Sequence, residues 1–389
     1  MSRLSRIWMA VIVSVVMPLS GFAADDLPDP GGPGSRGVVG VLRKLGTFID
    51  SMSIRGLDRD YIEMPEKPWQ VIVKAKNYQS DLKIKSTLSG KMFSPDWGDI
   101  YWEPQIKTDI SAYAGAWVGY RGYGIGYSKN LRGHGGLLEF GAVGGSYGVN
   151  LRIHRFQTDE PKVHLSGYMP EWMETSFDYY LIDPIRVRTL TLDGYYLFNG
   201  KRFSYAAAYD QSVIQKRSAG SLMAGAMYHH SSVAYDKGID ADFILFMNDI
   251  GRIKQSQLSV GAGYAYNYVP CRGLLVSAMA MPMLTVYNRI DIWRYHSKLR
   301  EKAMEQQQNP VADDDIDLDW EDFEIWLAGK EKEHSRVTLT YDARLSVTYN
   351  LGSWFFNVFG QYNRFHFKHS DSSGRLHDWY IHASVGMRM

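Results

Sequence analysis

The stretch that decides the fold is RVTLTYDARLSVTYN, which runs from Arg336 to Asn350. Its odd-numbered positions, from Val337 to Tyr349, are all apolar or aromatic, and its even-numbered positions are all polar or charged. Successive side chains of a strand point to opposite faces, so this segment predicts a long strand with one apolar face and one polar face. Similar strands recur along the chain, and the pattern is typical of an antiparallel β-barrel that spans a membrane.

The start of the chain has the composition of a secretory leader. Two arginines precede an apolar run over residues 7–19, and Gly-Phe-Ala at residues 21–23 gives a small-x-small cleavage site. A permanent membrane helix would need about 20 apolar residues, and this run is interrupted earlier. We therefore predict a cleavable signal peptide over residues 1–23 and export to the envelope of a Gram-negative cell.

The composition narrows the classes of function. The chain has 43 basic and 42 acidic residues, so no bulk charge favours nucleic acid. Its only cysteine, Cys271, excludes an intrachain disulfide framework. The 26 tyrosines and 11 tryptophans are residues that favour membrane–water boundaries.

The strand pattern divides the chain. Residues 24–68 are expected to form a periplasmic linker and an amphipathic helix. Residues 69–389 are expected to form an all-β, transmembrane, antiparallel up-and-down barrel of about 12 strands, within a range of 10–14. Connections such as 288–335 are long and predicted to be extracellular, whereas turns such as 350–353 are short and predicted to be periplasmic.

One turn signal is especially strong. Asn199-Gly200 is the dipeptide most typical of a two-residue hairpin turn. It predicts that residues 186–198 and 202–210 are paired strands.

Alternation alone does not say which face meets lipid, because a soluble barrel also has one apolar face. Aromatic residues gather where the apolar rows end, as at Tyr268, Tyr349 and Trp354, and the opposite rows mix glycine with polar and charged residues. We predict that the apolar rows face lipid and that the polar rows enclose the lumen. A periplasmic or secreted β-sandwich is the alternative.

Four segments carry a resemblance to a known family. They are DRDYIEMP at 58–65, FNGKRFSY at 198–205, QKRSAGS at 215–221 and GAGYAYNY at 261–268. Together they resemble a domain-of-unknown-function family of outer-membrane β-barrel proteins from Bacteroidetes-type bacteria. The resemblance implies fold and location for roughly residues 55–389, and it implies no activity and no site residue.

The polar rows supply charges of both signs that could select solutes in a constriction or pair in a packed network. Asp342 and Arg344 are neighbours on one face and would pair readily. The candidate lumen-lining residues are Lys107, Asp109, Arg152, His154, Asp342, Arg344, His382 and Arg388.

An acidic run lies within the connection 288–335. Five of its acids, Asp313, Asp315, Asp317, Asp319 and Glu324, fall at calcium-loop spacing. The position that needs glycine is Leu318, so a solvated extracellular loop is favoured over a calcium site.

Apart from this weak calcium-loop spacing, no spacing of residues indicates a catalytic site, a metal site or a cofactor. The sequence favours a non-enzymatic barrel that passes a small solute or acts as an envelope scaffold. A surface adhesin or receptor that uses its extracellular loops is an alternative, and a lipid-modifying enzyme is a further one. The expected partners are outer-membrane lipid, lipopolysaccharide and the barrel-assembly machinery, with no nucleic acid.

Overall fold

The computed structural model describes residues 56–389 except for a set of short gaps, so the predicted signal peptide and amphipathic helix lie outside the described residues. The gaps are 90–98, 108–109, 159–161, 169–171, 179–180, 182, 235, 237–243, 245–248, 299–300, 302–323, 335–336 and 369–371.

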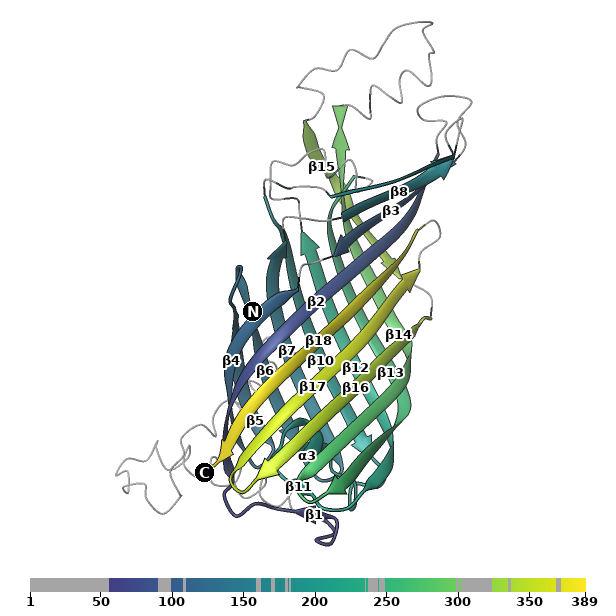
Figure 1. The fold of residues 1–389 in the computed structure, drawn as a ribbon. Helices are drawn as coiled ribbons and strands as arrows, with labels where there is room; N and C mark the ends of the chain where they lie inside the picture. Colours follow the sequence, from purple (N-terminus) through teal and green to yellow (C-terminus); the bar gives the residue numbers. More distant parts are fainter. Residues whose placement is uncertain are drawn as a thin grey trace, which may run out of the picture.

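Twelve antiparallel strands form a closed barrel, in which each strand pairs with the next one along the ring and β18 pairs with β2 (Figure 1). This confirms the predicted all-β, 12-stranded barrel. The strands of the ring are β2 (Trp69–Ser89), β4 (Ser111–Tyr120), β5 (Tyr123–Asn130), β6 (Gly135–Val143), β7 (Tyr147–Thr158), β10 (Ile185–Leu197), β12 (Ala219–Ala234), β13 (Ile250–Cys271), β14 (Leu274–Ser297), β16 (Leu339–Leu351), β17 (Trp354–Lys368) and β18 (Ser372–Arg388).

The barrel is apolar outside and polar inside, as the alternation around β16 predicts. Val337 and Leu345 are 71% and 64% exposed, whereas Thr340 and Asp342 on the opposite face are 0% exposed. A soluble β-sandwich would bury the apolar row instead. The exposed apolar row is therefore the outer wall of the barrel.

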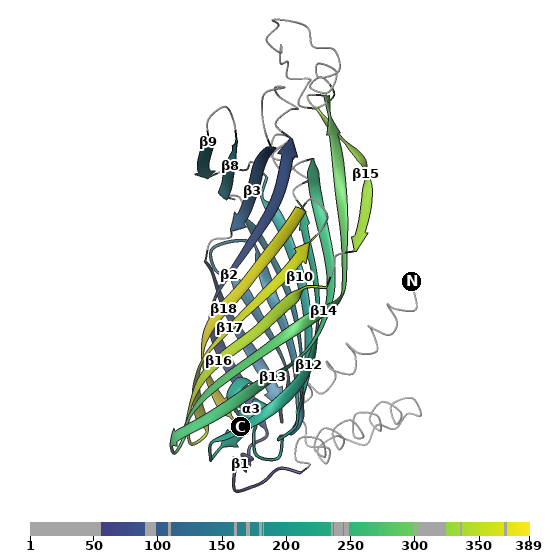
Figure 2. The same ribbon diagram turned by 90° about the vertical axis from the view of Figure 1, so that its right-hand side faces the viewer.

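Four further strands extend the wall beyond the ring at one end, which we call the far end (Figures 1 and 2). β3 (Asp99–Lys107) pairs with β2, and β8 (Lys162–Tyr168) and β9 (Trp172–Asp178) continue that sheet. β15 (Ile325–His334) pairs with the last part of β14. Strand therefore occupies part of the connection 288–335 that was expected to be a loop.

The predicted hairpin at Asn199-Gly200 is wrong. β10 ends at Leu197 and pairs directly with β12, and residues 198–218 between them fold back into the barrel. They contain the five-residue helix α3 (Tyr205–Tyr209) and the short strand β11 (Ile214–Gln215), which pairs with β1 (Ile62–Glu63). Figure 1 shows α3 inside the barrel, at the end opposite the far end.

The local sequence explains this difference. The side chain of Ser204 accepts a hydrogen bond from the Ala207 N–H, which starts a helix where a strand was expected. A Cβ on Gly200 would clash with the Gly145 carbonyl oxygen, so this glycine permits close packing against the β6–β7 turn rather than a two-residue hairpin. Within the described residues, no helix is long and apolar enough to cross a membrane.

Candidate functional site

The most distinctive site of the barrel is the lumen around residues 198–218, which we call the plug. Its helix brings the side chain of Tyr205 and three consecutive alanines into buried positions. Phe203 of the plug is also buried, with 0% exposure. The plug therefore has a packed apolar core of its own inside the ring of strands.

Polar side chains of the barrel wall hold the carbonyl oxygens at the end of α3. A helix leaves its last carbonyl groups without partners inside the helix, and here the wall supplies their donors. The bonds run from Ser346 Oγ to the Ala208 oxygen at 2.6 Å, from Gln70 Nε2 to the Asp210 oxygen at 2.9 Å, and from Arg388 Nη2 to the Gln211 oxygen at 2.8 Å.

A second layer closes the mouth of the barrel below the plug. The Asp58 N–H donates to the Lys201 oxygen at 2.9 Å, and the carboxylate of Asp58 pairs with Arg202 at 3.3 Å. The guanidinium of Arg202 lies 5.1 Å from the centre of the Tyr61 ring. The segment before β2 is thus fastened across the outer surface of the plug.

The four segments that carry the family resemblance meet at this place. Residues 58–65 contain β1, residues 198–205 begin the plug, and residues 215–221 continue from β11 into β12. From residues 261–268, Asn267 on β13 donates to the Ser204 oxygen at 2.8 Å. The segments are far apart in the sequence but form one assembly at the closed mouth.

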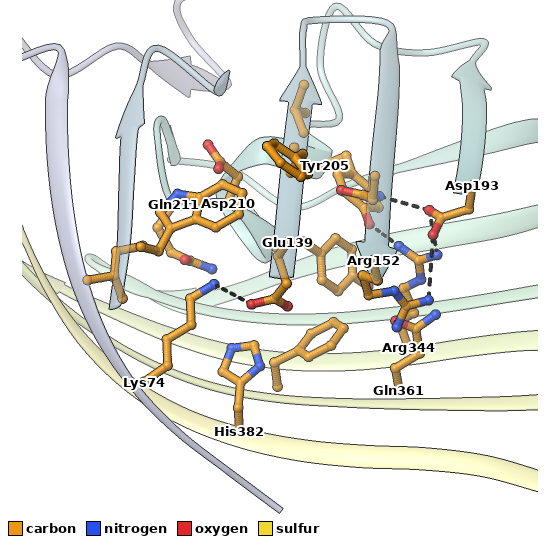
Figure 3. Close-up of a pocket in the computed structure, with 18 of the residues that line it drawn as sticks. Lys74, Glu139, Arg152, Asp193, Tyr205, Asp210, Gln211, Arg344, Gln361 and His382 are labelled. Atoms are coloured by element: carbon orange, nitrogen blue, oxygen red, sulfur yellow. Dashed lines mark hydrogen bonds and ion pairs between the residues drawn. The ribbon is translucent and has the colours of Figure 1, made fainter. Parts of the chain in front are cut away.

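A network of charged groups lies between the plug and the opposite wall (Figure 3). Arg344 on β16 pairs with Asp342 at 2.7 Å and with Asp193 on β10 at 2.9 Å. It also donates to the hydroxyl of Tyr205, which ties the network to the plug. Arg152 on β7 lies 3.6 Å from the other oxygen of Asp193. The positive charges of two arginines thus neutralise the negative charges of two aspartates in the buried lumen.

A smaller cluster of charges lies on the neighbouring part of the wall. Glu139 on β6 forms an ion pair with Lys76 and lies 3.9 Å from Lys74, both on β2. The Lys74 ammonium lies 4.4 Å from the centre of the Trp117 ring. The carboxylate of Glu139 therefore lies near two lysine charges. The ring of Trp117 stabilises the ammonium of Lys74 through a cation–π contact.

A polar cavity of about 70 Å³ remains beside these two clusters. It is lined by both wall and plug, including Glu139, Arg344 and Tyr205 (Figure 3). A buried water needs about 10–15 Å³ of such space, so the cavity has room for a few waters and no larger solute. The lumen is filled at this level.

Asp210 is a carboxyl group of the plug that lies against the wall. Its side chain is buried, and burial raises the pKa of the carboxyl above its ordinary value, because the charged form loses hydration. The hydroxyl of Ser212 and the charge of Lys74 act in the opposite direction.

The far half of the lumen differs from what the polar rows predict. Apolar side chains enter it beside polar ones such as Gln255, among them Phe156 on β7, Val187 on β10 and Leu376 on β18. These three residues line a second cavity of only about 30 Å³. Inward-facing apolar residues interrupt the polar rows here, and alternation alone gives no reason to expect them.

The structure places most candidate lumen residues together. Arg152, Asp342 and Arg344 belong to the charged network. His154 contacts the Tyr113 hydroxyl at 2.8 Å, and Arg388 holds the plug. The side chain of His382 lies in the lining of the 70 Å³ cavity.

The remaining candidates lie elsewhere. Lys107 is on β3, which is not a strand of the ring. Glu324 pairs with Lys298 at 3.3 Å, whereas Asp109, Asp313, Asp315, Asp317 and Asp319 lie outside the described residues. In the described part of the chain no group of three or more His, Cys, Asp or Glu side chains could hold a metal ion.

Sequence reasoning missed the plug, including Tyr205, which joins the charged network. The signal was present, because Ser204 precedes Tyr-Ala-Ala-Ala-Tyr, and serine before a run with three alanines is a typical helix start. The stronger expectation from Asn199-Gly200 concealed it.

The family model described as "Domain of unknown function (DUF4421)" matches residues 56–386. This match confirms the resemblance to a domain-of-unknown-function family, and the bacterial group stays a prediction. No curated protein matches the sequence.

Solved structures give weaker likenesses. The outer membrane protease OmpT of Escherichia coli is 9% identical with a TM-score of 0.41, over 85% of this chain and 100% of that chain. The translocator domain of the autotransporter NalP of Neisseria meningitidis is 11% identical with a TM-score of 0.29, over 95% and 100% of the two chains. The outer membrane protein OprG of Pseudomonas aeruginosa is 8% identical with a TM-score of 0.24, over 82% and 96%.

Proposed function

From the premise that this chain belongs to the DUF4421 family, we propose that it is a non-enzymatic outer-membrane β-barrel, closed at rest, that acts as an envelope scaffold. Membrane placement is supported by the closed ring and by the apolar outer wall. Closure leaves no unpaired strand edge, which a bilayer requires of any strand-built span.

The orientation follows from the connections between strands. Apart from the plug, the connections at the plug end are short: β13 ends at Cys271 and β14 begins at Leu274, and β16 ends at Leu351 and β17 begins at Trp354. Bacterial barrels have short turns on the periplasmic side and longer loops outside. The plug end is therefore assigned to the periplasm and the far end to the cell surface.

One observation carries the closed state: inward side chains are buried as in a solid core. Gln257 on β13, Ser277 on β14 and Thr340 on β16 are all 0% exposed, although they face the lumen. An open aqueous pore would expose such side chains to water along its length. The charged network adds to this argument, because its carboxylates are occupied by arginines rather than facing a passage.

Single-channel recording in planar bilayers tests this proposal. The full-length protein should give no stable conductance steps, and heat-modifiable migration of the same sample should show that the barrel is folded. Steady steps from the folded, unmodified protein would overturn the closed state.

A gated small-solute pore is the second candidate. It is favoured by the polar cavity of about 70 Å³, which lies where a moving plug would first open space. In this case recordings should be silent at low voltage and show steps once the plug is displaced. A scaffold would stay silent when the plug alone is released.

A further inference from the structure

The outer wall has a groove across five neighbouring strands, β13, β14, β16, β17 and β18, which lie side by side at the front of Figure 1. Its volume is about 670 Å³, within the roughly 300–1,000 Å³ of typical ligand pockets. Tyr264 and Tyr266 form one side, and Tyr362, Trp379 and Ile381 form the other. The groove thus lies on the surface that faces lipid.

Small residues in register make the floor of the groove. Ala280 on β14 lies opposite Ala343 on β16, and Leu345 on β16 lies opposite Gly360 on β17. A Cβ on Gly360 would have Ile381 Cγ1 as its nearest neighbour, at 3.7 Å, which is an ordinary contact. The backbone does not require glycine at position 360, so the open space there is available to a guest.

Cationic side chains lie immediately above the groove, toward the far end. Arg364 follows Tyr362 on the outer face of β17, and its partner in register is His377 on β18. Arg375 lies one outward position further along β18, with Lys83 of β2 as its partner. Within the described part of the chain, Arg364, Arg375 and Lys83 form no ion pair, and the one carboxylate beside them is Asp81, which lies opposite His377 in register.

Aromatic residues mark the boundary between groove and cations. The hydroxyl of Tyr362 lies 2.6 Å from Nδ1 of His377, and the Trp379 indole N–H donates to Gln79 at 3.2 Å. Tyrosine and tryptophan with their polar ends satisfied in this way are typical of the membrane–water interface. The apolar groove therefore lies at hydrocarbon depth and the cations at headgroup depth.

We propose that this groove and its cations form a binding site for the phosphorylated glycolipid of the outer leaflet. An acyl chain would lie over Ala280, Ala343 and Gly360. Phosphate groups would lie against Arg364, Arg375 and Lys83, because guanidinium and ammonium donors suit phosphate oxygens. The site rests on the proposed membrane orientation, which places these cations at the outer leaflet.

Native mass spectrometry of the full-length protein in detergent, titrated with diphosphorylated lipid A, tests the site. The wild type should retain one lipid A, and the triple variant R364Q/R375Q/K83Q should bind it at least tenfold more weakly. The variant G360L, which fills the floor, should show a similar loss. Undiminished binding by either variant would overturn the proposal.

Two matched controls separate this site from general affinity for lipid. R155Q/R188Q removes two exposed arginines that are opposite each other in register on β7 and β10. G194L adds the same side chain at a glycine of the wall whose nearest neighbour would lie at 3.8 Å. Both controls should bind lipid A like the wild type, and a tenfold loss in either would overturn a local site.

Competition between lipid A and other phosphate-containing ligands tests which chemical groups the site recognises. Inorganic phosphate at the same molar concentration should not displace lipid A, and phosphatidylglycerol should bind at least tenfold more weakly. Displacement by phosphate, or equal binding of phosphatidylglycerol, would overturn the assignment to a glycolipid. Conductance by the wild type would contradict the closed barrel but leave this binding result unchanged, so the two proposals fail separately.

Discussion

At the plug end the lumen is filled by a folded-in segment that hydrogen bonds hold in place, whereas at the far end it is filled by side chains of the wall itself, many of them apolar. Ser346 and Arg388 donate to backbone oxygens of the plug, whereas the hydrocarbon side chains of Phe156 and Leu376 make no hydrogen bonds. The first filling depends on the geometry of particular donors. The second depends on buried area, which is less sensitive to direction.

The two fillings lie one after the other along the lumen, so each of them closes the barrel by itself. A single hydrogen bond contributes about 0.5–1.5 kcal/mol net, while deletion of a buried phenylalanine side chain costs about 3–5 kcal/mol. The plug is therefore the part that smaller perturbations can loosen. The apolar layer should keep the lumen closed when they do.

The largest expected effect comes from removing both fillings. Replacement of residues 199–217 by a short Gly-Ser turn removes the plug, because β10 and β12 already pair directly. F156A/L376A empties part of the apolar layer. Each change alone should leave planar bilayers silent, and the two together should give stable conductance steps. Full conductance after plug removal alone would show that the apolar layer is no seal.

Loss of the central arginine should have the next largest effect. R344A leaves the buried carboxylates of Asp193 and Asp342 without their closest cation, which should lower the free energy of unfolding by about 3–5 kcal/mol. Guanidinium unfolding in lipid vesicles measures this change. The control R272A alters an exposed turn and should stay within about 0.5 kcal/mol. A loss below about 1 kcal/mol for R344A would mean that the network is dispensable.

Loosening the plug should be milder. S346A/N357A removes two wall side chains that donate to the Ala208 oxygen. The Gln211 side chain still donates to this oxygen at 3.0 Å, so the cost should be that of the lost hydrogen bonds alone, about 0.5–1.5 kcal/mol each. Trypsin should then cleave the plug at Lys201 or Arg202 several-fold faster in detergent, without cleavage of the barrel. The control S353A, at an exposed position, should be cleaved at the wild-type rate.

The smallest effect should be a dependence on pH. Burial raises the pKa of Asp210 in the folded state, so the unfolded chain ionises first as the pH rises above about 4. Stability should therefore fall with rising pH until the folded carboxyl also ionises, by roughly 1.4 kcal/mol for each pH unit between the two pKa values. Unfolding midpoints across this window should fall for the wild type relative to D210N. If the unfolding midpoints of the wild type and D210N changed with pH in the same way, the buried position of this carboxyl would be contradicted.

The barrel could be predicted from the sequence because the alternation along residues 336–350 directly encodes the two faces of the wall. Pairing of Asp342 with Arg344 also followed from their spacing on one face. The plug could not be predicted in the same way, because its position depends on contacts with Gln70 and Arg388, more than 100 residues away. The apolar layer at the far end could not be predicted, because an inward-facing valine or phenylalanine only interrupts the alternating pattern. Its packing partners come from distant strands and cannot be identified from the sequence.

The closure of β18 on β2 has a consequence for the order of biogenesis. The wall donors to the oxygens at the end of α3 come from β2, β16 and β18, which lie on both sides of this seam. The plug leaves β10 and joins β12 at the mouth of the barrel, so it can enter the lumen from the mouth whether or not the seam has closed. The full set of these hydrogen bonds can exist only when β18 has paired with β2, so the plug should reach its final position together with closure of the ring.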